Sequence, residues 1–152
     1  MKTKSYLAAL FGGLVFFSTL TLFADNDNEA KREMLSLHET IAEYQGLHYH
    51  LCRGRTTACP EKCGDSGEFA TFKIVKYLNY KKPGEYGDPK QASYRIQVSD
   101  FNKNPISGKY TKQVTQLKKG DRVLLSWRHD YVTTKGGSKF PDRVVSKLQK
   151  TE

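Results

Sequence analysis

Two histidines and three cysteines lie in one short stretch of this chain, HYHLCRGRTTACPEKC. Imidazole and thiolate are the side-chain ligands that zinc prefers, and the softness of thiolate also suits copper. A tetrahedral site needs four ligands at about 2.0 to 2.3 Å from the ion. One interpretation of the stretch is therefore a zinc or copper site, with candidate ligands His48, His50, Cys52, Cys59 and Cys63.

The spacing of the cysteines leaves a second interpretation open, because it does not match the C-x₂-C pairs familiar from zinc sites. His48, His50 and Cys52 would share a face only if their segment is extended. A disulfide between Cys52 and Cys59 or Cys63 would close a loop of about 8 to 12 residues and stabilise the domain by about 2 to 3 kcal/mol. Cys59 with Cys63 is a third pairing. With three cysteines in the chain, one bridge leaves a thiol over.

Two catalytic interpretations of the same residues fail on context. The run Gly64-Asp65-Ser66-Gly67 is similar to the nucleophile loop of chymotrypsin-like proteases, but those enzymes need two barrels, and a turn leading into a strand explains the run. A cysteine nucleophile with His129 as its base would lack an orienting third group, because Asp130 points to the opposite side of the strand. We therefore expect no enzymatic activity and assign no catalytic residue.

The N-terminal residues predict export. A positive start, MKTK, precedes an uncharged run that ends in Leu22-Phe23-Ala24, with a small residue where a signal peptidase cuts. We interpret residues 1–24 as a signal peptide, and the alternative is an uncleaved membrane anchor. Export places the chain in a periplasm or outside the cell, where disulfides persist.

The charge of the chain favours anionic partners. Lysine and arginine number 25 against 16 acidic residues, which gives a net charge of +9. Such a charge attracts polyanions without saying anything about fold. Because export disfavours nucleic acid, we expect an anionic envelope polymer or an oligosaccharide, and a membrane contact only if the signal segment stays uncleaved. Aromatic side chains flanked by cations suit such ligands, and the candidate binding surface comprises Lys73, Tyr77, Arg95, Trp127 and Arg128.

The segment after the signal peptide, residues 25–46, is predicted to be an amphipathic helix. Its apolar residues recur every three or four positions, which puts them on one helical face. Gly46 would mark the end of this helix. The residues that set the period are Ala30, Met34, Leu37, Ile41 and Tyr44.

Residues 47–152 are predicted to be a small β-domain with a cysteine-rich loop at 52–67. Alternating apolar and polar residues, separated by turn signals, are typical of half-buried strands. Five mostly antiparallel strands of uneven length resemble a small, partly open barrel of the oligonucleotide/oligosaccharide-binding type, and a sheet packed on the helix is the alternative. The expected strands are residues 47–52, 68–80, 92–101, 122–134 and 140–148.

Three functional hypotheses follow. The first is an exported, non-enzymatic binding or structural module without a cofactor, which the cysteines staple. The second is a zinc-binding or copper-binding protein that uses the histidine and cysteine cluster. The third is a small thiol or hydrolytic enzyme, which would require a free cysteine of low pKa.

Overall fold

The structure is a computed structural model that describes residues 30–54 and 56–151. The predicted signal peptide, residues 1–24, lies outside the described residues. Five strands form one antiparallel sheet in the order β3-β2-β1-β4-β5, which confirms the mainly β class. The four later strands overlap their expected ranges, but the expected first strand at residues 47–52 is wrong, because residues 47–50 are the last part of a strand that begins at Lys31. The elements are β1 (Lys31–His50), β2 (Gly67–Lys81), β3 (Ser93–Gln97), α1 (Thr111–Val114), β4 (Arg122–Thr133) and β5 (Lys139–Lys150).

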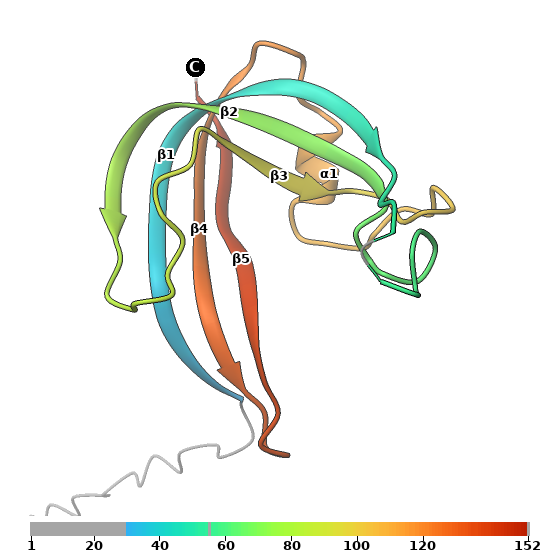
Figure 1. Cartoon of the computed structure of the whole chain (residues 1–152). Helices are drawn as coiled ribbons and strands as arrows, with labels where there is room; N and C mark the ends of the chain where they lie inside the picture. The colour runs from blue at the N-terminus through green and yellow to red at the C-terminus, as the bar shows by residue number, and fades with distance from the viewer. Residues whose placement is uncertain (1–29, 55, 152) are drawn as a thin grey trace, which may run out of the picture.

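Strand β1 occupies the centre of the sheet and pairs with β2 on one side and with β4 on the other. Shifts in its pairing register interrupt both ladders, for example between Tyr44 and Gly46, where Gly46 has a φ of 107°. Such bulges bend a strand and increase its twist. The sheet is accordingly strongly curved, as Figure 1 shows, but it does not close into a barrel, since β3 and β5 remain its edges.

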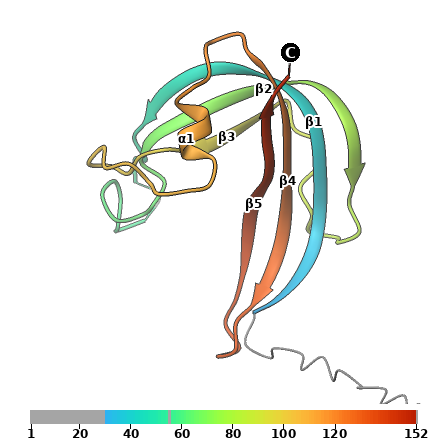
Figure 2. The same ribbon diagram turned by 180° about the vertical axis from the view of Figure 1, so that it is seen from behind.

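The core fills the concave side of this curved sheet. Side chains from β1, β2, β3, β4 and β5 meet there, and Trp127 at the centre is fully buried. The short helix α1 contributes Val114, and the Tyr110 hydroxyl before it donates to the backbone oxygen of Ser146 on β5. The α1 segment thus covers the open side between β3 and β5 (Figure 2). Within the described residues, no helix has the length and apolarity to cross a bilayer.

The predicted N-terminal helix is wrong over its described part, because residues 31–46 belong to strand β1. The buried face of that strand has a period of two and carries polar residues, including Ser36, His38 and Thr40, all fully buried. Their polar atoms are satisfied internally, as where Thr40 Oγ1 donates to the Leu125 backbone oxygen at 2.9 Å. Because the buried positions carry polar residues, the hydropathy pattern does not show a period of two. The apolar residues of the opposite face, such as half-buried Met34, instead recur at a spacing typical of a helix.

Replacing Gly67 by alanine is expected to destabilise the domain by about 2 to 4 kcal/mol. Gly67 begins β2 with a φ of 142°, and a Cβ atom there would collide with the backbone oxygen of Ser99. The matched control is Gly136→Ala, because the nearest atom to its added Cβ is Thr134 Oγ1 at 3.9 Å. Urea unfolding of both variants measures the difference, and equal free energies of unfolding would contradict the close approach.

Candidate functional site

The three cysteines lie on the loop that joins β1 to β2, which extends beyond the ends of these strands in Figure 1. Hydrogen bonds hold the described part of this loop both at its base and within it. The backbone N–H of Cys52 donates to Ser66 Oγ at 3.0 Å, and the N–H of Lys62 donates to the backbone oxygen of Ala58 at 2.8 Å in a helical turn. Ser66 is buried and acts as a clamp across the base of the loop, so the Gly-Asp-Ser-Gly run is structural.

The loop brings all three thiol groups together. The sulfur atoms of Cys52, Cys59 and Cys63 lie within 4.8 Å of one another, and those of Cys52 and Cys59 are 3.2 Å apart. Cys52 is buried, with 2% of its surface exposed, while the other two are half-buried. Three converging sulfur atoms at the edge of solvent are accessible to a metal ion and supply the soft donors that zinc and copper(I) bind.

The environment of the cluster shifts the pKa values of two of its thiols in opposite directions. Thr56 directs its backbone N–H and its hydroxyl toward Cys59 Sγ, at 3.4 and 3.5 Å. These contacts, together with the Cys52 thiol, lower the pKa of Cys59 to about 6. The hydrogen bond to Cys59 and burial raise the pKa of Cys52 to about 11. Cys59 is therefore the more acidic thiol of the pair.

The structure brings the predicted cysteines together but not the predicted histidines. His48 and His50 are exposed near the end of β1, whereas Cys52 is buried, so the three do not share a direction. Neither histidine belongs to the group of close ligand atoms. All three cysteines are free, with no sulfur pair at bonding distance, and a disulfide stays a prediction.

The predicted ligand surface is only partly a surface. Trp127 is fully buried, so its assignment to an exposed platform is wrong. Tyr77 is half-buried and its hydroxyl accepts the Gln91 backbone N–H at 2.7 Å. Lys73 and Arg95 are exposed on neighbouring strands, and Arg128 is half-buried on β4, where it donates to Asp130 at 3.0 Å. Of the five residues, Lys73 and Arg95 alone keep the predicted role of exposed cations.

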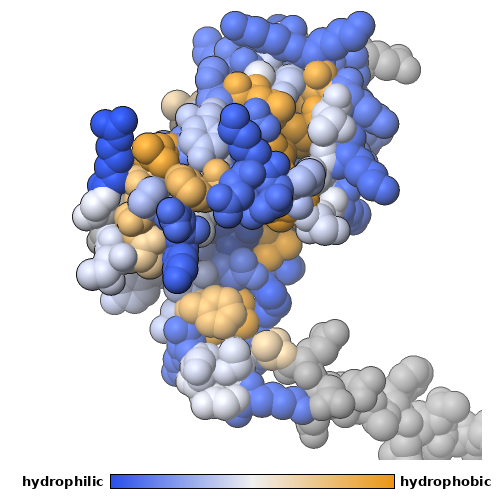
Figure 3. Space-filling view, turned by 90° about the vertical axis from the view of Figure 1, so that its right-hand side faces the viewer, coloured by the Kyte–Doolittle hydropathy of each residue, from blue (hydrophilic) through white to orange (hydrophobic). Residues whose placement is uncertain are grey.

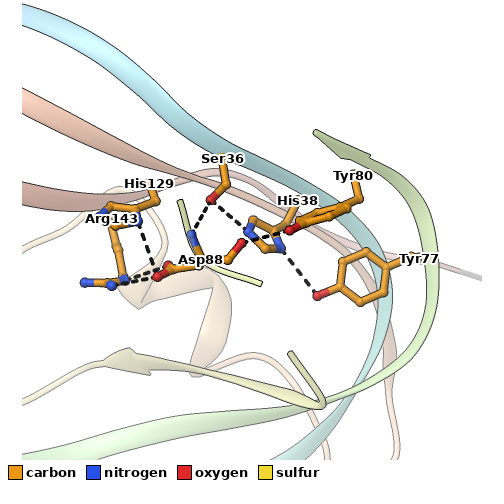
Figure 4. A network of polar contacts seen from close by, with 7 residues as sticks. All are labelled: Ser36, His38, Tyr77, Tyr80, Asp88, His129 and Arg143. Atoms are coloured by element: carbon orange, nitrogen blue, oxygen red, sulfur yellow. Dashed lines mark hydrogen bonds and ion pairs between the residues drawn. The ribbon is translucent and has the colours of Figure 1, made fainter. Parts of the chain in front are cut away.

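A buried polar network that the sequence analysis missed is centred on Asp88, in the loop between β2 and β3 (Figure 4). Arg143 of β5 donates to both carboxylate oxygens of Asp88 at 2.8 Å. Nδ1 of His129 lies 3.3 Å from the same carboxylate without hydrogen-bond geometry, and neither nitrogen of its ring has a hydrogen-bond partner among the described residues. The network also fixes the loop, because Ser36 Oγ accepts the Asp88 N–H at 3.2 Å.

His38 links this network to the core. Its Nε2 lies 3.0 Å from Ser36 Oγ, and its ring stacks on Trp127 at 4.4 Å between centroids. Tyr94 also stacks on Trp127, at 4.3 Å between centroids. Ser36 and His38 have the spacing of a nucleophile and its base, but both are fully buried. The pair therefore contributes hydrogen bonds to the interior of the domain.

The two ionisable residues of the network respond to burial differently. Desolvation by burial would raise the pKa of Asp88, but the hydrogen bonds and charge of Arg143 outweigh it and lower the pKa below its usual value. Desolvation by burial lowers the pKa of His38. The charge of Asp88 opposes this effect and raises the pKa, whereas the charge of His129 lowers it further. The network is therefore built around an ionised Asp88 and a neutral His38.

Comparisons with protein-family models, with curated proteins and with solved structures find no match to this chain.

The protein is expected to lose stability as the pH falls from about 7 to about 5. The pKa of His38 is lower in the folded chain than the 6.5 of an unperturbed histidine, so the unfolded chain takes up a proton first. The stability is thus complete above this range and declines within it. Urea unfolding at several pH values should show a flatter profile for His38→Phe than for the wild type.

The matched control for this experiment is His48→Phe, since His48 is exposed. Its pH profile should follow the wild type. A wild-type free energy of unfolding that stays constant over this pH range, or an equal decline in His38→Phe, would show that His38 is not the group responsible.

Proposed function

We propose that this chain is a small exported β-domain that binds one soft metal ion, zinc or copper(I), through Cys52, Cys59 and Cys63. The observation that carries the proposal is the convergence of the three sulfur atoms within 4.8 Å. Zinc takes four ligands, so a three-sulfur site leaves one position for a water molecule or an external ligand. Copper(I) selects soft thiolate ligands and suits the same donor set.

The proposal departs from a mixed histidine and cysteine site. The geometric support is for sulfur alone, because the close group of ligand atoms contains neither His48 nor His50. A bound ion would join both halves of the loop, since Cys52 precedes the turn at Ala58–Lys62 and Cys63 follows it. Metal binding is therefore expected to contribute to the stability of the folded loop.

A second candidate function, binding of an anionic polymer or acidic oligosaccharide, is favoured by the outer face of β2 and β3. Lys73 pairs in register with Ser93, and Thr71 with Arg95, so the exposed side chains of Lys73 and Arg95 lie on one face. The Arg95 guanidinium is 5.0 Å from the centroid of the Phe69 ring. The net charge of +9 supports the same class of partner.

We also infer that the sheet is an open variant of the oligonucleotide/oligosaccharide-binding barrel. Three features support this inference: five antiparallel strands with β1 at the centre, the strong curvature of β1, and the α1 segment that packs between the edge strands β3 and β5. Such a likeness by itself assigns no ligand.

The protein should be purified in two ways, from an oxidising compartment and under reducing conditions. The protein with reduced thiols is expected to carry a single zinc or copper ion. Native mass spectrometry and elemental analysis count the ion, and X-ray absorption should give metal–sulfur distances of about 2.3 Å for zinc. Cys52→Ser, Cys59→Ser and Cys63→Ser should each lose the metal, whereas the double variant His48→Ala/His50→Ala should keep it. Metal loss in the histidine variant, or retention in all three serine variants, would overturn the sulfur-only site.

Reversal of the exposed charges in Lys73→Glu/Arg95→Glu is expected to abolish most binding to a heparin hexasaccharide, and wild-type affinity should fall as salt is added. The control with the same change in net charge is Lys112→Glu/Lys119→Glu, at two exposed positions, one in α1 and one in the turn before β4. Isothermal titration calorimetry compares the two variants. Equal loss of affinity in both would mean that only overall charge attracts the polyanion, and would refute a site on this face.

A further inference from the structure

A cavity adjoins the Asp88 network, whose His129 and Arg143 form part of its lining. Its volume is about 600 Å³, which lies within the range of small-molecule sites. It is bounded by the first part of β1, the β2–β3 loop, the end of β4 and the start of β5. Figure 3 shows apolar side chains on the narrow lower part of the molecule, beneath an overhang formed by the wider upper part. The lining residues are Glu33, Leu35, Tyr86, His129, Tyr131, Pro141 and Arg143.

One wall of the cavity is an exposed tyrosine on a firmly anchored loop. Tyr86 is 78% exposed, far more than a core-forming residue would be. The loop beneath it is clamped, because Gly84 N–H donates to the Leu35 backbone oxygen at 3.1 Å, and a Cβ atom at either Gly84 or Gly87 would collide with Leu35. On the other side of Tyr86, the carboxylate of Asp88 is held by Arg143. The backbone on both sides of Tyr86 is thus held in place, while the tyrosine itself stays out of the core.

The polar groups of the cavity are few and their charges are balanced. Glu33 and Arg143 contribute one charge of each sign, and Arg143 already forms its paired hydrogen bonds with Asp88. His129 is 4% exposed and neither ring nitrogen has a hydrogen-bond partner among the described residues. A strongly charged ligand would meet a like charge here, and a purely apolar ligand would leave the buried histidine unpaired.

We propose that this cavity binds a ring of an uncharged oligosaccharide. A sugar ring has an apolar C–H face that packs on a tyrosine or proline, and a rim of hydroxyl groups that both donate and accept hydrogen bonds. Tyr86, Tyr131 and Pro141 provide the flat apolar surfaces, while Glu33 and Arg143 provide an acceptor and a donor for the hydroxyl groups. The open side, where Tyr86 is exposed, lets a chain of further sugars leave the cavity.

This site is separate from both proposed functions. It contains no cysteine, and its lining includes neither Lys73 nor Arg95. Binding of an uncharged sugar should therefore be unaffected by a metal chelator and should change little with added salt, in contrast to a polyanion on the outer face of β2 and β3. Failure of this proposal and failure of the metal site would be distinguishable in one preparation of the protein.

The test is a titration of the ¹⁵N-labelled chain with the uncharged hexasaccharides of glucose and of N-acetylglucosamine, followed by heteronuclear NMR. At least one of them should shift the amide signals around Tyr86 and Tyr131 in a saturable manner, with chelator present or absent. Tyr86→Ala should weaken this binding roughly tenfold. Because Tyr86 is largely exposed, this variant should keep the wild-type spectrum elsewhere.

The matched control is Tyr49→Ala, since Tyr49 is another exposed tyrosine, at 44%, and does not line the cavity. Its affinity should stay within about twofold of the wild type. The proposal is refuted if neither hexasaccharide gives a saturable shift, if Tyr49→Ala weakens binding as much as Tyr86→Ala, or if the shifts occur only with a heparin hexasaccharide and map to the face of Lys73 and Arg95.

Discussion

The pairing of β1 on both of its edges is the constraint on which the rest of this structure depends. Its twenty residues, Lys31–His50, hydrogen-bond to β2 and to β4, so this one strand holds the two halves of the sheet together. The bulges along β1 curve the sheet and create a concave side deep enough to bury Trp127. The two candidate sites lie toward opposite ends of the same strand. The cysteine loop follows its C-terminal end, and Glu33 and Leu35 near its N-terminal end line the cavity.

The strands that could be predicted from sequence are those with apolar inward faces. β4 alternates Val123, Leu125 and Trp127 inward, and the structure confirms its expected bounds to within one residue. β1 could not be predicted in the same way, because its inward residues from Ser36 to Thr40 are polar and find their partners only in the folded chain. A hydropathy value describes each side chain by itself, whereas the burial of a polar group depends on a hydrogen-bond partner that is distant in sequence.

The same distinction separates the two candidate sites. The three cysteines are close in sequence, so their grouping could be predicted. Whether His48 and His50 join them could not be predicted, because their position depends on where β1 ends and how the loop turns. The Asp88 network escaped prediction because its members come from different elements. Asp88 and Arg143 are 55 positions apart, and Asp88 stands in a Gly-Asp-Pro sequence that indicates only a turn. Its role arises from the docking of that turn onto β1 and β5.

The odd number of cysteines bears on how the β1–β2 loop is held. A disulfide would use two of the thiols and leave the third without a function, whereas a metal ion coordinated by all three would use each of them. Either bond would have the same mechanical consequence, since the loop is otherwise joined at its base by the hydrogen bond between Cys52 and Ser66. Cys63 lies in one close group with Cys52 and Cys59, and this placement is the geometric basis of the proposed ion. A three-sulfur site also leaves a coordination position open on zinc, and such an ion can bind an external ligand as well as stabilise the fold.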